Sequence, residues 1–148
     1  MKRLNKNGKK ETYILLILLI LVILFRCFFS FAVVNGTSMY PTYRNNQILL
    51  TRRAFSIDRY DCVVVKYKDK LLVKRVIGLP GEKIEYISNK LYIDGELMED
   101  VHAYGNTDDF CFTVSDDCYY CLGDNREISQ DSRRYGEFKK SQIVSIVI

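Results

Sequence analysis

The chain has 148 residues, enough for one membrane segment and one compact domain of about a hundred residues. Its net charge of +4 comes from its beginning: residues 1–34 carry six basic groups against one acidic group, whereas the remaining 114 residues carry 16 basic and 17 acidic groups. The main domain is therefore nearly neutral, which argues against a nucleic-acid partner.

The beginning of the chain reads as a membrane anchor. Residues 1–11 form a basic, polar tail, and residues 12–34 contain an apolar run of 22 residues that starts at Tyr13 and has Arg26 as its only charge. Such a run is long enough to cross a bilayer as a helix. The five basic residues before it predict a cytoplasmic N-terminus and an extracytoplasmic domain. The alternative is a cleaved signal peptide, because Ser30-Phe31-Ala32 has suitably placed small residues.

Residues 35–148 are predicted to form a mostly β domain, a small barrel or sandwich attached to one transmembrane helix. Short β-branched runs, alternating apolar and polar residues, and tight-turn signals such as Asp94-Gly95 recur along this part of the chain. Polar residues 98–109 are predicted to be an exposed loop. The predicted strands are residues 47–51, 62–67, 71–77, 83–87, 91–93, 110–114, 119–122 and 143–148.

The five cysteines form an odd set without a disulfide or metal-binding pattern. Cys118 and Cys121 make a CxxC pair, but they lie in a predicted strand, where residues three apart point to opposite faces. This arrangement disfavours both a local disulfide and a shared metal ion. We interpret the cysteines as packing residues and predict no metal site.

Ser38 is a candidate nucleophile that lies between Gly36 and Pro41, just after the apolar run. The glycine permits close backbone approach and the proline stiffens the chain, although an ordinary turn has the same features. A serine nucleophile needs a base within hydrogen-bond reach. The only histidine, His102, lies in the polar loop with nothing to orient it, and we interpret it as solvent-exposed.

Lysine is the other candidate base, because burial among apolar groups lowers its pKa and allows it to be neutral. Lys74 is embedded in an apolar strand, between Leu71-Leu72-Val73 and Val76-Ile77. The alternative is an ordinary strand lysine that faces solvent. A third cluster, residues 123–133, is dense in small polar and charged side chains that could brace a site or simply form a turn.

Three segments together resemble the motif boxes of type I signal peptidases, in that family's order and after an N-terminal anchor. They are residues 36–42 (GTSMYPT), 74–81 (KRVIGLPG) and 123–133 (GDNREISQDSR). The resemblance covers residues 12–148 and is to the short bacterial forms common in Gram-positive bacteria. It implies a membrane-anchored serine endopeptidase that removes signal peptides from exported preproteins after an Ala-x-Ala-like site.

The resemblance also implies roles for individual residues, with no metal or organic cofactor. Ser38 matches the nucleophile and Lys74 the general base of a Ser/Lys dyad that works through an acyl-enzyme. Ser129 matches a serine that hydrogen-bonds the lysine amine, and Asp131 and Arg133 match a salt-bridged pair. The substrate is expected to add as a β-strand. Shallow apolar pockets for it are expected to be lined by Ala32, Val34, Gly36, Met39, Leu72 and Val73.

Gly36 departs from those relatives that carry a serine at this position, whose hydroxyl helps to hold the oxyanion. Without that hydroxyl, the oxyanion is expected to depend on backbone N–H groups, chiefly that of Ser38. The loss of one such donor can cost a few kcal/mol of transition-state stabilisation.

Two other functions remain open from the sequence. A Ser/Lys maturase with a narrow client, such as a pilin or a conjugation-system protein, would use the same residues. A non-catalytic, membrane-tethered β-domain that binds peptides would have Lys74 exposed or distant from Ser38. For the signal peptidase, the expected partners are exported preproteins and the lipid bilayer, and the expected location is the cell membrane with a single span.

Overall fold

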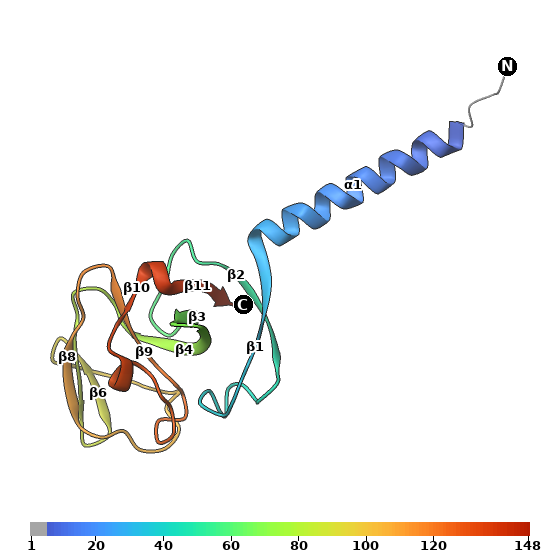
Figure 1. Ribbon diagram of the computed structural model, residues 1–148. Helices are drawn as coiled ribbons and strands as arrows, with labels where there is room; N and C mark the ends of the chain where they lie inside the picture. Colours follow the sequence, from blue (N-terminus) through green and yellow to red (C-terminus); the bar gives the residue numbers. More distant parts are fainter. Residues whose placement is uncertain (1–5) are drawn as a thin grey trace. The chain divides into compact units, whose positions relative to one another are not determined.

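The computed structural model describes residues 6–148 and consists of two compact units, Met1–Ser30 and Phe31–Ile148 (Figure 1). Residues 1–5 of the predicted basic tail lie outside the described residues. Helix α1 (Lys6–Phe28) contains the first part of the apolar run, from Tyr13 to Phe28. Among the described residues it is the one helix long and apolar enough to cross a membrane. Its 19 residues from Lys10 to Phe28 extend about 28 Å, close to the roughly 30 Å of hydrocarbon in a bilayer.

Helix α1 ends at Phe28, before the predicted end of the anchor at residue 34. Residues Phe29–Val33 instead form strand β1, which lies beside β2 (Ile48–Arg53) in the larger sheet. The pairing continues one residue past β1, where the Val34 N–H donates a hydrogen bond to the Gln47 carbonyl at 2.9 Å. The last part of the apolar run therefore belongs to the β fold rather than to the helix.

The mostly β class is confirmed, with two antiparallel sheets (Figure 1). The larger sheet has seven strands in the order β1-β2-β11-β3-β4-β9-β10, and the smaller has four in the order β7-β6-β5-β8. The remaining strands are β3 (Cys62–Tyr67), β4 (Lys70–Gly78), β5 (Lys83–Ile87), β6 (Lys90–Ile93), β7 (Glu96–Met98), β8 (Phe110–Thr113), β9 (Cys118–Leu122), β10 (Phe138–Lys139) and β11 (Ile143–Val147). Two short helices, α2 (Ser132–Tyr135) and the 3-10 turn η1 (Lys140–Gln142), lie near the C-terminus.

Each of the eight predicted strands is found within one or two residues of its predicted bounds, and β1, β7 and β10 are additional. The predicted hairpin at Asp94-Gly95 joins β6 to β7, and both residues have positive φ, as such a turn requires. The prediction of an exposed His102 is wrong. Its side chain is half-buried, and the centroid of its ring lies 5.9 Å from that of Tyr60.

Three apolar clusters form the core of the β domain. One includes Cys121 of β9, and another includes Cys118 of the same strand, so the two cysteines face opposite sides of the sheet as predicted. All five cysteines of the chain are free thiols, and the prediction that they are packing residues is wrong for Cys27 and Cys111, which are exposed. The third cluster lies under the Ser38 segment and consists of Val34, Met39, Leu49, Cys62 and Val73.

Candidate active site

Ser38 lies in a turn that begins just after β1. Gly36 opens this turn with φ +89°, which favours glycine, and its N–H donates to Asn45 Oδ1 at 2.7 Å. Met39 follows the serine and is completely buried in the cluster beneath it. The Ser38 carbonyl accepts the Asn125 N–H at 3.0 Å. The main chain at Ser38 is thus held from both sides, with the side chain only half-buried.

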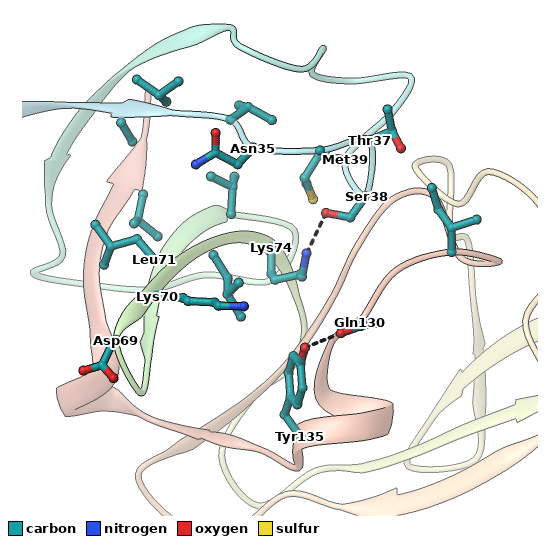
Figure 2. Close-up of a pocket in the computed structure, with 18 of the residues that line it drawn as sticks. Asn35, Thr37, Ser38, Met39, Asp69, Lys70, Leu71, Lys74, Gln130 and Tyr135 are labelled. Carbon is teal, nitrogen blue, oxygen red and sulfur yellow. Dashed lines mark hydrogen bonds between the residues drawn. The ribbon is translucent and has the colours of Figure 1, made fainter.

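Lys74 lies on β4, where it pairs with Val63 of β3, and only 3% of it is exposed. Its Nζ is 2.7 Å from Ser38 Oγ, and Figure 2 shows the two side chains pointing toward one another across the cleft. Burial lowers the pKa of Lys74 from 10.5 to about 8, although the nearby Asp131 and Asp124 carboxylates partly oppose this. A buried amine that loses its proton near pH 8 can act as a base toward the adjacent hydroxyl.

Asp131 and Arg133 form the ion pair that the family resemblance implies. Arg133 donates to both carboxylate oxygens of Asp131, at 2.9 and 2.8 Å. The buried Asp131 also caps helix α2 and accepts the Gly123 N–H at 3.0 Å. Its carboxylate therefore fixes the two ends of the segment 123–133 to each other.

Ser129 does not make the hydrogen bond to Lys74 that the resemblance implies. Its Oγ is buried and has no hydrogen-bond partner among the described residues. The hydroxyl lies directly against Gly123, where a Cβ would be 2.1 Å from Ser129 Oγ and 2.6 Å from the Ser38 carbonyl oxygen. Gly123 is thus the position that lets the third segment approach the nucleophile closely.

A second buried ion pair was missed from the sequence. Arg75 donates to both carboxylate oxygens of Asp124, at 2.8 and 2.7 Å, and to the Tyr60 carbonyl at 2.8 Å. Thr42 donates to the same carboxylate. These bonds join β4, the Ser38 turn and segment 123–133. The available signal was an arginine next to Lys74 and an aspartate in the third motif segment, but nothing in the sequence pairs them.

A cleft of about 890 Å³ extends from the two candidate catalytic residues (Figure 2). Ser38 and Lys74 lie toward one end of it, and Asp69, Lys70 and Leu71 toward the other. Among residues 6–148, no group of three or more His, Cys, Asp or Glu side chains could hold a metal ion. The cleft is lined by every residue predicted to contact substrate, namely Ala32, Val34, Gly36, Met39, Leu72 and Val73.

Both long walls of the cleft carry a strand edge that has no strand neighbour in the described part of the chain. β1 is the first strand of the larger sheet, so one of its edges has no strand neighbour among the described residues. On the opposite wall, β4 pairs with β3 from Lys70 onward but with β9 only from Arg75. The other edge of residues 70–74 is therefore also free of a strand neighbour in the described part of the chain. An extended peptide can hydrogen-bond to such edges.

The chain is similar to known proteins over nearly its full length. The model of the family described as "Signal peptidase, peptidase S26" matches residues 9–148. Signal peptidase I S of Bacillus subtilis is 36% identical, with 97% of this chain and 90% of that protein covered. Signal peptidase I of Streptococcus pneumoniae strain R6 is 35% identical, with 95% of this chain and 91% of that protein covered.

A solved structure agrees with these matches. The crystal structure of a signal peptidase I from Enterococcus faecalis V583 has a TM-score of 0.59 and 30% identity, and it covers 63% of this chain and 97% of that chain. Matches of this extent and identity show that the chain belongs to the signal peptidase family, peptidase S26, a family of serine endopeptidases.

Proposed function

We propose that this chain is a membrane-anchored signal peptidase that cuts exported preproteins after an Ala-x-Ala-like site, with Ser38 and Lys74 as its catalytic dyad. The observation that carries the proposal is the buried Lys74 Nζ at 2.7 Å from Ser38 Oγ. A non-catalytic peptide-binding domain would have this lysine exposed or more than about 4 Å away. The observed geometry favours catalysis.

In the proposed mechanism, neutral Lys74 accepts the Ser38 proton while Oγ attacks the substrate carbonyl. The protonated lysine then gives that proton to the leaving amine, which separates the mature protein from the acyl-enzyme. A water molecule, activated by the same amine, releases the signal peptide from Ser38. The amine must be neutral when it takes the proton of Ser38 and again when it takes that of water, and burial favours this form by lowering its pKa to about 8.

The oxyanion is proposed to be held by the main chain. Gly36 has no side chain to contribute, and its N–H is already bound to Asn45. The Ser38 N–H donates to no other group among the described residues. It is therefore the donor available for the negative charge that develops on the substrate carbonyl oxygen.

The substrate is proposed to lie in the cleft as an extended strand between β1 and the first half of β4. Residues 31–33 of β1 and 70–74 of β4, which have no strand neighbour on this side among the described residues, can offer backbone hydrogen bonds to such a strand. Alternate side chains of the substrate would then point toward the apolar lining around Val34 and Val73. Small residues suit this lining, because Val34, Met39 and Val73 are already packed into the buried cluster beneath it.

Helix α1 is proposed to span the membrane with its N-terminus in the cytoplasm. The support is its apolar length and the five basic residues before the apolar run. Ser38 follows Phe28 by ten residues, so it can lie no more than about 35 Å along the chain from the end of the helix. The cleavage site of a preprotein also follows an apolar segment, which fits this proximity.

The test is cleavage of a purified preprotein by the full-length protein and its variants. We expect Ser38→Ala and Lys74→Ala each to lower kcat by at least about 1,000-fold, because neither residue works without the other. Lys66→Ala, at an exposed lysine of β3, is the matched control and is expected to retain activity. Undiminished cleavage by Ser38→Ala or Lys74→Ala would rule out the dyad.

A further inference from the structure

Two exposed tyrosines lie beside the nucleophile but outside the cleft. Tyr40 is 43% exposed and Tyr104 is 50% exposed, and their rings meet edge to face with centroids 5.4 Å apart. Tyr40 follows Ser38 by two residues, whereas Tyr104 comes from the long loop after β7. Neither is among the residues that line the cleft.

The same short segment holds Tyr104 and Ser38 in place. The Tyr104 N–H donates to the Asp124 carbonyl and its own carbonyl accepts the Arg126 N–H, each at 2.8 Å. Between those two residues, the Asn125 N–H donates to the Ser38 carbonyl at 3.0 Å. Residues 124–126 therefore bind both the tyrosine loop and the nucleophile turn. The aromatic pair is fixed relative to the reacting hydroxyl, unlike an isolated aromatic residue on the surface.

The cleft and the tyrosines suit different parts of a substrate. Most residues that line the cleft precede Ser38 or belong to the start of β4, and in the proposed function these hold the residues before the cut. The chain that follows the cut must continue past Ser38 and leave the cleft. We propose, on the basis of that proposed function, that Tyr40 and Tyr104 bind the first two residues after the cleavage site and favour apolar or aromatic side chains there.

Tyrosine rings are suited to this role. They present a large contact area with few rotatable bonds; an aliphatic side chain that packs on them is stabilised by burial, and an aromatic one gains stabilisation beyond burial. The interaction is with the leaving part of the substrate, so it acts on acylation. It has no effect on hydrolysis of the acyl-enzyme, because the residues after the cut have already left.

The experiment uses the full-length protein in detergent–phospholipid micelles and two synthetic peptides. The peptides are identical up to an Ala-x-Ala cleavage site and carry either Phe-Ile or Ser-Gly immediately after it. We expect the wild type to cleave the Phe-Ile peptide with a kcat/KM about fivefold to tenfold higher. Tyr104→Ala and Tyr40→Ala should each remove most of this preference.

A methyl ester of the same acyl peptide, which has no residues after the cut, is the second substrate. The tyrosine variants are expected to hydrolyse it within about twofold of the wild type, because its leaving group does not reach the rings. Val101→Ala, at an exposed apolar residue of the same loop, is the matched control and should keep the preference. Tyr104→Phe should also keep it, since the ring rather than the hydroxyl makes the contact.

Three results would overturn the inference. The first is a wild type that cleaves both peptides equally well, which needs no variant to observe. The second is a preference that survives both tyrosine substitutions. The third is an equal loss on the peptides and the ester, which would show that the tyrosines only support the Ser38 turn. A wild type that cleaves neither peptide would instead refute the proposed function, and this inference would fail with it.

Discussion

Lys74 illustrates how one residue obtains its chemistry from its surroundings. The amine is surrounded by β4, the Ser38 turn and segment 123–133, and this burial is the main cause of its lowered pKa. The nearby Asp131 carboxylate raises that pKa but is itself bound by Arg133. Arg133 thereby limits the effect of the carboxylate on the amine. Because Asp131 is paired with Arg133, the Lys74 amine is not held as an ammonium by that carboxylate and remains available as a base.

Asp124 allows a prediction at the scale of single residues. Its carboxylate neutralises the buried Arg75, so Asp124→Asn would leave that guanidinium charge without a counterion. We expect a loss of about 3–5 kcal/mol in the free energy of unfolding, measured by thermal or denaturant unfolding in detergent. The matched control is Glu85→Gln, which breaks a pair in which the Lys83 side chain is half exposed. That substitution should leave the free energy of unfolding nearly unchanged, because solvent screens the exposed pair. Equal costs for the two variants would contradict this account of the buried pair.

At the scale of elements, strand β1 has two functions in the chain. It completes the edge of the larger sheet, and it supplies Ala32 to one wall of the cleft. The sequence predicts these residues as part of the anchor, because the apolar run shows no break between helix and strand. The aromatic and β-branched residues of 29–33 favour a strand once β2 is present to pair with them.

Two truncated proteins test this role of β1. A protein that begins at Phe29 keeps the strand, and we expect it to cleave a short Ala-x-Ala peptide in solution. A protein that begins at Asn35 lacks the strand and one wall of the cleft, and its kcat/KM should fall by at least about 100-fold. Circular dichroism and unfolding measurements would separate loss of the cleft from loss of the fold. Comparable activity of two folded truncations would show that β1 is dispensable.

Other elements show what the sequence could and could not predict. The bounds of β3 and β5 are those predicted, because runs such as Cys62–Tyr67 are apolar or alternating and end at turns. Strands β7 and β10 have only three and two residues, too few to show a period. The pairing of Arg75 with Asp124 depends on how β4 packs against a distant segment, and a local pattern contains no such information.

At the scale of the whole molecule, the candidate site exists only where three distant segments converge. The Ser38 turn, β4 and segment 123–133 are joined by the Arg75–Asp124 pair and by the Asn125 bond to the Ser38 carbonyl. The three motifs resemble those of a known family in sequence and order, and this resemblance predicts that the three segments meet in one site. The distances, the unpaired Ser129 hydroxyl and the second ion pair follow only from the packed structure.

The pH dependence of cleavage tests the Ser/Lys dyad most directly. Because the pKa of Lys74 is lowered to about 8, roughly one tenth of the amine is neutral at pH 7 and about half at pH 8. Under conditions where acylation limits the rate, we expect kcat/KM for a fixed Ala-x-Ala peptide to rise about tenfold per pH unit below pH 7 and to level off above pH 9. A rate that is independent of pH between 6 and 9, or one that rises only near pH 10.5, would contradict the dyad.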